Sequence, residues 1–411
     1  MPSPSVVFGG PSLEHDVSIL TGLQAARVLA RSGPEPVVLY WSESNGWFRV
    51  RPDLEAPAFL DGVPSDARQV CLELGSGEPG FYETRSFGRR GRIDIAAVVN
   101  CCHGGPGEDG RLQGLFDLAG IACTGPTAAC AALTMDKLAF GGMMDAAGLP
   151  VLPRIAWGSS APEPSFAGPY IVKPRFGGSS IGIEIASDVQ TARDLAKTSA
   201  YLRRGAVLEQ YRDGVEDIYI AIRSYPELQF SLVERPRPGS VPGSGDSSEP
   251  GEASSEGPGA GGAATSRRGA ATSRSGGGQI YGYQQKYLEQ QGAESRVSEI
   301  PAQLPDETGK LLRMLAEEVA HLTRLTGAAR LDFLWDGSQL WVNELNSIPG
   351  ALAFRLWAES GVSHEQLLAD MLAEAAATHS VPGHVDPPDR HASDRKMQTL
   401  QTAGKIAQKL T

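Results

Sequence analysis

Hydrophobic residues in the first part of the chain recur at two spacings, which predict strands and helices in alternation. Residues 5–8 form a short apolar run that stops at a pair of glycines, and residues 17–29 then carry apolar side chains at roughly helical spacing. Further apolar runs at residues 36–41 and 93–100 alternate with helical or polar segments. This pattern predicts an α/β domain with a mainly parallel sheet over residues 1–124.

A second unit follows, and its pattern predicts one helix and one β-hairpin. The helix is expected over residues 133–147, where Gly148 ends it. Apolar runs at residues 169–174 and 182–185 flank a glycine loop, so this loop is typical of a hairpin connection and not of a strand-to-helix turn. We assign residues 125–208 to this unit.

The third predicted unit spans residues 209–378. Strands are expected at residues 207–211 and 218–224, followed by a helix at residues 307–326 and a second hairpin at residues 329–345. The order of elements therefore predicts three domains, the first of them built on a parallel sheet.

Two segments fall outside this pattern of strands and helices. Residues 236–278 are almost wholly Gly, Ser, Ala, Pro, Glu and Arg, a composition that cannot bury enough apolar surface to offset its ordering entropy. We expect a disordered insertion there. Residues 379–411 begin polar and proline-rich, and we expect them to form a C-terminal appendage.

Length, charge and cysteine content narrow the class of protein. The 411 residues are enough for two or three domains, and the net charge of -11 disfavours nucleic acid as a partner. The five cysteines are odd in number and include no CxxC pair, which favours buried free thiols in a reducing compartment. No signal-peptide pattern and no apolar run of membrane-spanning length occurs in the sequence, so we expect a cytoplasmic protein without a membrane partner.

The second predicted hairpin carries the strongest group of chemically competent residues. Arg330 and Asp332 lie on one strand, and Glu344 and Asn346 lie two residues apart on the next, so the latter pair shares a sheet face. Asp332 lies on the same face if the loop contains an odd number of residues, for example three residues with Trp335 paired to Gln339. Two carboxylates and an amide oxygen suit Mg²⁺ that is also held by substrate phosphates. A polar outer face of a hairpin explains the same residues equally well.

Two lysines and the glycine loop indicate a phosphate site. Lys173 follows an apolar strand and precedes the loop at residues 177–180, whose backbone N–H groups could hold phosphate oxygens, and Lys137 is a second cation of this kind. The P-loop pattern does not occur in the sequence, which disfavours a Walker ATPase. Residues 105–110 fit the glycine spacing of a dinucleotide site, but no acid stands at the expected ribose position, so we do not interpret them as an NAD site.

Taken together, these segments resemble the D-alanine–D-alanine ligase family of ATP-grasp enzymes. The resemblance rests on seven motifs in order: Glu14-His15-Asp16-Val17-Ser18, residues 103–110, Met135-Asp136-Lys137, Lys173-Pro174 with Gly178-Ser179-Ser180, Lys286-Tyr287, Arg330-Leu331-Asp332, and Glu344-Leu345-Asn346 with Pro349-Gly350. It implies a three-domain ATP-grasp fold that is α/β overall and α+β in its ATP-grasp part. It also implies a homodimer.

The resemblance assigns roles to residues across the chain. For the nucleotide, it implies that ATP is bound by Lys137, Lys173, Gly178, Ser180 and Lys286, with Glu209 and Tyr211 at the adenine and Glu216 at the ribose. For the metal, it implies two Mg²⁺ ions, replaceable by Mn²⁺, on Asp332, Glu344 and Asn346. For the amino acids, it implies that Glu14 holds the first ammonium group near His103, that the hydroxyls of Ser179 and Tyr287 form a linked polar contact, and that Arg330 and the Gly350 amide form the oxyanion hole.

Several of these residues also have purely structural explanations. Glu14 precedes a helix, where acids are favoured by the helix dipole, and His103 could be an ordinary residue at the end of a strand. Ser179 could simply cap its loop, and Tyr287 could be a core residue.

The pattern departs from the family just after Gly350. Members of the family carry a stretch with Thr and Ser there, which helps to receive the carboxylate of the second substrate, whereas residues 351–357 of this chain contain no hydroxyl. The resemblance implies synthesis of D-alanyl-D-alanine for peptidoglycan from amino-acid substrates. Because of this departure, we consider two alternatives. Either the second substrate is an amine other than D-alanine, or Arg355 replaces the missing groups and binds the carboxylate of the second substrate. A non-catalytic ATP-binding protein is a further alternative, which the full set of catalytic motifs disfavours.

Overall fold

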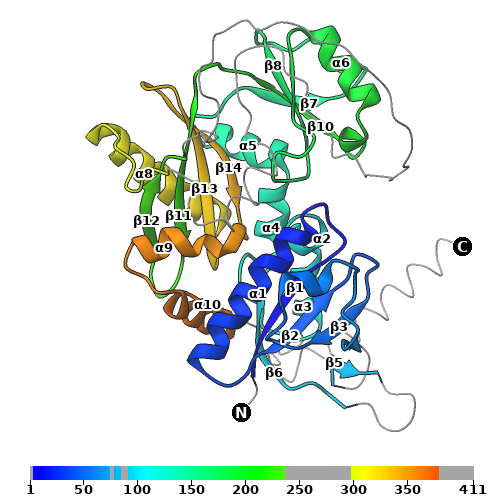
Figure 1. The fold of residues 1–411 in the computed structure, drawn as a ribbon. Coiled ribbons are helices and arrows are strands. Elements are labelled where there is room, and N and C mark those ends of the chain that lie inside the picture. Colours follow the sequence, from blue (N-terminus) through cyan, green and yellow to red (C-terminus); the bar gives the residue numbers. More distant parts are fainter. Residues whose placement is uncertain (1–2, 75–77, 85–90, 237–297, 379–411) are drawn as a thin grey trace, which may run out of the picture.

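The structure, a computed structural model, describes residues 3–74, 78–84, 91–236 and 298–378. Most of the predicted insertion, the C-terminal tail, Lys286 and Tyr287 lie outside these residues. The described chain forms three β-sheets, which Figure 1 shows as three separate bodies with the N-terminal sheet at the bottom and the central sheet at the top.

The N-terminal sheet has six strands in the order β5-β4-β3-β2-β1-β6. Its elements are β1 (Ser3–Gly9), α1 (His15–Ser32), β2 (Val37–Trp41), β3 (Trp47–Val50), η1 (Ala56–Phe59), β4 (Arg68–Glu73), β5 (Gly80–Glu83), β6 (Ile95–Asn100), α2 (Gly105–Glu108) and α3 (Arg111–Leu118). The predicted strand, glycine turn and helix at the start of the chain are confirmed.

The expectation of a mainly parallel N-terminal sheet needs correction. Strand β1 runs parallel to β2 and to β6, but the pairs β2-β3, β3-β4 and β4-β5 are antiparallel. The connection from β2 to β3 is too short for the helical crossover that a parallel pair requires, so it forms a hairpin. The parallel part is therefore a three-strand core with an antiparallel extension.

Alternating side chains of β1 bury both faces of this sheet. Val6 and Phe8 pack with α1 on one face, and Val7 packs on the other face with Leu112 and Phe116 of α3. The first face is also covered from the far end of the chain by α10 (His364–Thr378), while α9 (Phe354–Glu359) packs against β12 and adds Phe354 to the same core. The chain thus returns to its first domain after completing the third.

The central sheet has the order β7-β10-β8-β9. Its strands are β7 (Arg154–Trp157), β8 (Tyr170–Pro174), β9 (Glu184–Ala186) and β10 (Ala206–Gln210), with α6 (Val189–Thr198) and η2 (Ala200–Leu202) beside them. The antiparallel pairing of β8 with β9 confirms the predicted hairpin around the glycine loop. The expected boundary at residues 208 and 209 falls within β10.

The C-terminal sheet has the order β12-β11-β13-β14. Its strands are β11 (Glu216–Arg223), β12 (Gln229–Glu234), β13 (Ala328–Trp335) and β14 (Leu340–Asn346), and α8 (Asp306–Thr323) packs against it. Helices α4 (Ala128–Met135) and α5 (Lys137–Ala146) contribute Cys130, Phe140 and Met144 to the same core. Arg235 and Glu299 form an antiparallel bridge with two backbone hydrogen bonds of 3.0 Å, so the chain leaves and rejoins this sheet at one point.

The single helix expected over residues 133–147 is in fact two helices that meet at Asp136. The Asp136 side chain accepts hydrogen bonds from the backbone N–H groups of Leu138 and Ala139, which caps the start of α5. The same carboxylate forms an ion pair with Arg175 at 2.6 Å. These contacts hold Asp136 in an extended conformation, which ends α4 one residue before Lys137.

In the hairpin of β13 and β14, Asp332 lies on the expected face of the sheet, but the two strands pair in a different register from the expected one. Trp335 pairs with Leu340 and not with Gln339, which by itself would place Asp332 on the wrong face. A β-bulge beyond Phe333 shifts the register by one residue, so that Asp332 lies opposite Glu344 and Arg330 opposite Asn346. The bulge, and not the loop, brings the acidic residues onto one face.

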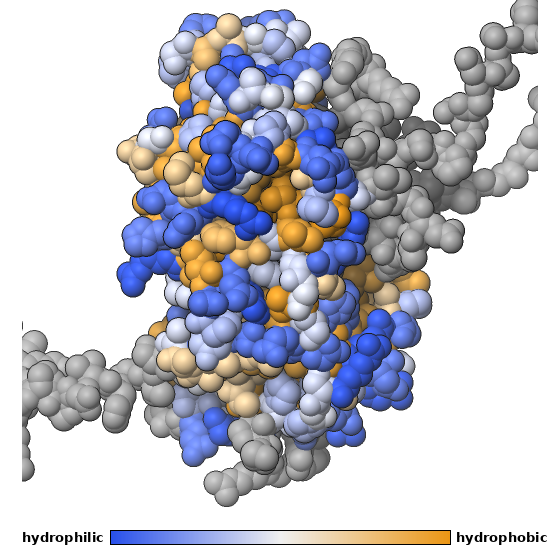
Figure 2. Space-filling view, turned by 90° about the vertical axis from the view of Figure 1, so that its left-hand side faces the viewer, coloured by the Kyte–Doolittle hydropathy of each residue, from blue (hydrophilic) through white to orange (hydrophobic). Residues whose placement is uncertain are grey.

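Hydrophilic residues predominate on the face of the molecule in Figure 2, with smaller hydrophobic groups interspersed among them. Across the described ranges, no helix has both the length and the apolar character needed to cross a membrane.

The closest approach of α1 to β1 occurs at Gly22, and it predicts a stability effect. A Cβ atom at Gly22 would lie 2.3 Å from the Phe8 ring, whereas one at Gly142 on α5 would meet nothing within 4 Å. Gly22→Ala is therefore expected to destabilise the fold by about 1 to 3 kcal/mol, and the control Gly142→Ala to stabilise it by about 0.5 to 1 kcal/mol. Urea unfolding measures both changes, and equal midpoints for the two variants would contradict this packing.

Candidate active site

One cavity is lined by residues from all three sheets. Its walls are formed by Glu14, His103, Glu108, Thr134, Met135, Lys137, Gly177, Gly178, Arg330, Glu344, Leu345, Asn346, Ile348 and Gly350. Its volume is about 30 Å³, against roughly 300 to 1,000 Å³ for a typical ligand pocket. The side chains at the junction are therefore packed against one another.

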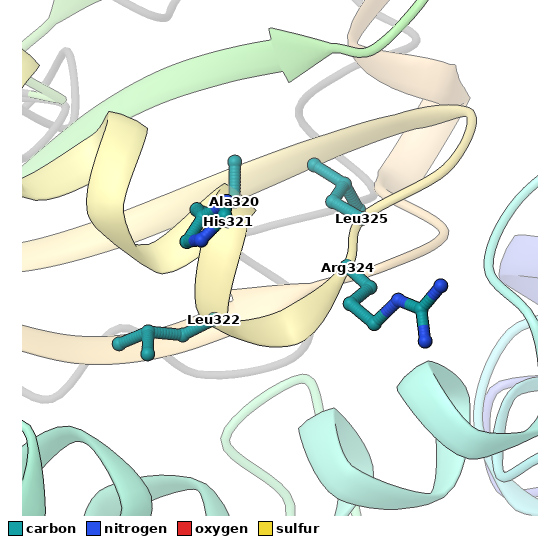
Figure 3. A pocket seen from close by; sticks show the side chains of 5 residues that line it. All are labelled: Ala320, His321, Leu322, Arg324 and Leu325. Carbon is teal, nitrogen blue, oxygen red and sulfur yellow. The ribbon is translucent and has the colours of Figure 1, made fainter.

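A larger hollow of about 600 Å³ lies elsewhere, at the C-terminal end of α8 (Figure 3). Its five lining residues, Ala320, His321, Leu322, Arg324 and Leu325, come from the last turn of α8 and the residues just after it. None of the predicted site residues lines it, so the smaller cavity is the candidate active site.

Glu14 joins the N-terminal domain to the glycine loop of the central sheet. The Ser179 hydroxyl donates a hydrogen bond to the Glu14 carboxylate, and both residues are buried. A Cβ atom at Gly178 would lie 3.0 Å from both carboxylate oxygens, and one at Gly104 would lie 2.3 Å from the nearer oxygen. Glycine at these two positions lets the backbone of each neighbouring segment approach the carboxylate.

Lys137 lies between the glycine loop and the C-terminal hairpin. Its ammonium group donates a hydrogen bond to the Gly177 carbonyl and lies 3.7 Å from Glu344 Oε2. Lys137 is buried at the first position of α5, where the cap at Asp136 places it. A single cation thus faces both the loop predicted to hold phosphates and one of the predicted metal ligands.

Lys173 and Glu209 form a buried ion pair that also includes Arg154. Glu209 lies 2.9 Å from Lys173 through one oxygen and 2.9 Å from Arg154 through the other. Burial opposes ionisation of Glu209, but Lys173 and Arg154 together hold its pKa below the usual value. Two cations and one carboxylate give this buried group a net positive charge, which suits the binding of a phosphate group.

Arg330 and Asp332 form a bidentate ion pair on β13. The guanidinium Nε and Nη2 atoms each lie 2.7 Å from a carboxylate oxygen of Asp332, and the Asn346 amide nitrogen donates to Asp332 Oδ2 at 3.1 Å. Tyr219 of β11 lies beneath the guanidinium group, with 4.3 Å between its ring centroid and Arg330 Cζ. The plane of the guanidinium group is therefore fixed from below and from one edge.

The oxygen donors of this face fit a magnesium site. Asp332, Glu344 and Asn346 offer two carboxylates and an amide from adjacent, paired positions, and such oxygen ligands are those that Mg²⁺ takes. In the described part of the chain, no cluster of three or more His, Cys, Asp and Glu residues has metal-binding geometry. Arg330 and Lys137 are the cations that offset these carboxylates.

His103 is held through both ring nitrogens. Its Nδ1 lies 2.9 Å from the Ile348 carbonyl and its Nε2 lies 2.8 Å from Thr21 Oγ1. Burial lowers the pKa of His103 to about 4, so the ring is neutral near pH 7. Because a carbonyl only accepts, Nδ1 carries the proton and Nε2 accepts from the Thr21 hydroxyl.

Glu108 is a buried carboxyl group that the sequence analysis did not assign to the site. Its two oxygens accept hydrogen bonds from Gly104 N at 2.9 Å and from Ile348 N at 3.2 Å. Burial, and next the negative charge of Glu14, raise the pKa of Glu108 to about 8. Glu108 is therefore a largely protonated bridge between the N-terminal domain and the loop that follows β14.

That loop ends in a backbone conformation that is unusual for its residues. Ala351, Leu352 and Ala353 have φ values of 48°, 49° and 54°, which lie in the left-handed region. This conformation costs roughly 1 to 2 kcal/mol per non-glycine residue. The segment is the one that departs from the family pattern, and Leu352 is buried in the core of the N-terminal domain.

Eight predicted residues in the described chain do not line the cavity, and four of them are Ser180, Tyr211, Glu216 and Arg355. Ser180 lies in the glycine loop with a φ of 56°, and the Tyr211 hydroxyl contacts Asp213 at 3.4 Å at the end of the central sheet. Glu216 is half exposed and lies 3.6 Å from Arg235. Arg355 is half exposed on α9 and lies 3.5 Å from Glu234. Lys286 and Tyr287 are outside the described residues.

The remaining predicted residues are brought together. Glu14, His103, Lys137, Gly178, Arg330, Glu344, Asn346 and Gly350 line the cavity, while Ser179 and Asp332 bond directly to lining residues. Lys173 and Glu209 reach it through Arg154, whose Nη1 donates to the Lys137 carbonyl at 3.2 Å. The sequence analysis missed Thr21, Glu108, Arg154 and Tyr219 as site residues. For Glu108 the signal was its place in the glycine-rich loop, whereas the other three stand in ordinary strands or helices.

Comparison with known proteins gives the family. Two family models match, one described as D-ala D-ala ligase N-terminus over residues 4–126 and one described as D-ala D-ala ligase C-terminus over residues 264–373. Together they cover more than half of the chain.

Individual relatives agree with these family models. A D-alanine–D-alanine ligase from Staphylococcus saprophyticus is 27% identical over 396 residues, which is 91% of this chain and 95% of that protein. D-alanine–D-alanine ligase B from Bradyrhizobium diazoefficiens is 29% identical over 389 residues, 91% and 93% of the two chains. The solved structure of VanG D-Ala:D-Ser ligase from Enterococcus faecalis has the same fold, with a TM-score of 0.65, 22% identity, and coverage of 91% of this chain and 99% of that one.

The fold is that of the ATP-grasp ligases, with an α/β N-terminal domain followed by two further four-stranded sheets. The chain belongs to the D-alanine–D-alanine ligase family. It is therefore an ATP-dependent ligase that acts on small-molecule substrates.

The raised pKa of Glu108 predicts a pH dependence of stability. Between about pH 4.5 and 8 the folded state keeps a proton on Glu108 that the unfolded state has lost, so this group stabilises the fold at low pH and the contribution disappears as pH rises through about 8. From pH 6 to 9 the wild type should lose roughly 2 to 3 kcal/mol relative to Glu108→Gln. Urea unfolding at several pH values measures this difference, and parallel pH curves for the two proteins would contradict the prediction.

Proposed function

We propose that this enzyme joins two molecules of D-alanine into D-alanyl-D-alanine for peptidoglycan synthesis. The observation that carries the proposal is the single cavity in which Glu14, Lys137 and Arg330 meet, each from a different part of the fold. The names of the relatives support the choice of substrate.

In the first step, the carboxylate of one D-alanine attacks the γ-phosphorus of ATP, and ADP leaves. Glu14, held by Ser179, is suited to bind the ammonium group of this D-alanine, because its carboxylate is buried and faces the cavity. Lys137 and Lys173 are suited to neutralise the phosphate oxygens. Such transfer depends mainly on positioning and on charge neutralisation.

In the second step, the amine of the other D-alanine attacks the carbonyl carbon of the acyl phosphate. The C–N bond forms, the amine loses a proton, and phosphate leaves with the electron pair of the C–O bond. Negative charge develops on the carbonyl oxygen, and we assign its stabilisation to Arg330 and the Gly350 amide, because both residues line the cavity. His103 orients the loop that carries Gly350, since both of its ring nitrogens are already hydrogen-bonded.

We assign two Mg²⁺ ions, replaceable by Mn²⁺, to Asp332, Glu344 and Asn346. When bound, such ions neutralise the phosphate oxygens and orient the γ-phosphate. Arg330 lies against both oxygens of Asp332, so this carboxylate would hold the guanidinium group and also offer its remaining lone pairs to an ion.

The nucleotide is assigned to the gap between the central and C-terminal sheets. Gly178, Ser180 and Lys286 are the proposed phosphate contacts, Glu209 and Tyr211 the proposed adenine contacts, and Glu216 the proposed ribose contact. Tyr287 is proposed to complete the polar contact with Ser179. We also propose a homodimer in the cytoplasm.

A second candidate function is ligation of D-alanine to a different amine. The observation that favours it is the segment after Gly350, which offers no hydroxyl and adopts the left-handed turn at residues 351–353. Arg355 follows this turn and is the cation proposed to receive the carboxylate of the second substrate.

A turnover assay separates these functions. ADP release is measured with ATP and Mg²⁺ across D- and L-amino acids, alone and in pairs, with mass spectrometry of the products. We expect turnover with D-alanine alone and formation of the dipeptide. Turnover only when D-alanine is paired with another amine would establish the second candidate, and a protein without turnover on any pair would reject both.

The role of Arg330 predicts a large loss of rate on its removal. Arg330→Ala should lower kcat by about 10² to 10³, because one donor to the developing oxyanion is lost. Arg51→Ala serves as the control, since Arg51 is an exposed arginine of the N-terminal domain. Near-wild-type kcat for Arg330→Ala would refute the assignment.

The proposed clamp predicts a selective effect on one substrate. Arg355→Ala should raise the KM of the second substrate by about 10- to 100-fold and leave the KM of the first unchanged, because a charge-assisted hydrogen-bond pair is lost. Glu234→Gln, which removes the present partner of Arg355, should not raise it. An unmoved KM in Arg355→Ala would mean that Arg355 only pairs with Glu234.

A further inference from the structure

Thr21 connects two segments that are far apart in the sequence. It is a buried residue of α1, and its hydroxyl oxygen lies 2.8 Å from His103 Nε2 and 3.1 Å from the backbone nitrogen of Ala351. His103 follows strand β6 of the N-terminal domain, whereas Ala351 belongs to the C-terminal part of the chain. The hydroxyl is therefore the meeting point of three segments.

The directions of these hydrogen bonds follow from the acceptors. The Ile348 carbonyl can only accept, so His103 donates from Nδ1 and its Nε2 must accept. The Thr21 hydroxyl is then the donor to Nε2, and its oxygen accepts from the Ala351 N–H. A hydroxyl is needed for this pattern, because it donates and accepts at once.

The two ends of this chain of hydrogen bonds enclose Gly350. His103 binds the carbonyl of Ile348, two residues before Gly350, and Thr21 binds the N–H of Ala351, one residue after it. Ala351 also begins the three-residue stretch of left-handed backbone. Such a stretch persists only where its surroundings hold it in place, and Thr21 is the side chain that binds its first N–H.

We propose that Thr21 is a positioning residue for the second chemical step, because its hydroxyl fixes the loop that presents the Gly350 amide to the carbonyl oxygen. This inference rests on the proposed function, in which that amide helps to stabilise the oxyanion. Thr21 does not contact the reacting atoms and acts through His103 and Ala351.

Two substitutions separate the hydroxyl from the shape of the side chain. Thr21→Val keeps the branched shape but removes the hydroxyl, and Thr21→Ser keeps the hydroxyl but removes a methyl group. We expect Thr21→Val to lower kcat by about 10- to 100-fold with little change in the KM for ATP, because the Ala351 N–H and His103 Nε2 lose their partner. Thr21→Ser should retain most of the activity.

A second measurement does not depend on the substrate. Hydrogen exchange of the full-length protein, followed by mass spectrometry of peptides that contain residues 348–353, reports how firmly the loop is held. We expect faster exchange there in Thr21→Val and near-wild-type exchange in Thr21→Ser. If the wild type proves inactive on D-alanine, the proposed function fails, while the exchange data still test whether Thr21 holds the loop.

Three outcomes would overturn the inference. Wild-type kcat in Thr21→Val would show that the hydroxyl is not needed for the reaction. Equal losses in Thr21→Val and Thr21→Ser would show that packing of the methyl group matters instead. Unchanged exchange at residues 348–353 in Thr21→Val would show that the loop is held without Thr21.

Discussion

The structure depends on charges that are buried where three sheets meet, and each of them has a polar partner. A buried charge without such a partner costs several kcal/mol, so these partners determine how the sheets approach. Glu14 accepts from Ser179 of the central sheet, and Lys137 lies near Glu344 of the C-terminal sheet. The ion pairs that close the cavity are thus the same groups that would contact substrates, and binding exchanges one set of partners for another.

The chain achieves this junction by returning to its starting point. Helix α10 follows the C-terminal sheet but packs against β6 and α1 of the N-terminal domain, and its Leu367 and Leu368 share one core with Phe8 and with Phe354 of α9. The loop after β14 is therefore anchored at both ends, by the sheet before it and by these helices after it. Glu108 and His103 then bind it from the N-terminal side.

Much of the fold and of the site follows from local sequence patterns, because most of the strands and helices are set by apolar spacing and by glycines. The glycine-loop hairpin was predicted correctly for this reason. The break at Asp136 was not, since it depends on the distant Arg175. The facing of Asp332 and Glu344 was predicted, but it arises from a bulge that no turn residue announces. Thr21 and Tyr219 gave no signal, because their roles exist only through contacts with residues remote in sequence.

The left-handed turn at Ala351, Leu352 and Ala353 places stability and activity in opposition. Glycine adopts this conformation without steric cost, so a glycine at Ala351, the least buried of the three positions, would relieve strain in the folded protein, whereas at Leu352 it would also remove a buried side chain. The same change would loosen the backbone beside Gly350, because glycine permits many other conformations. Selection for thermal stability alone would therefore act on the segment that we associate with the second substrate, and a more stable enzyme could be a less selective one.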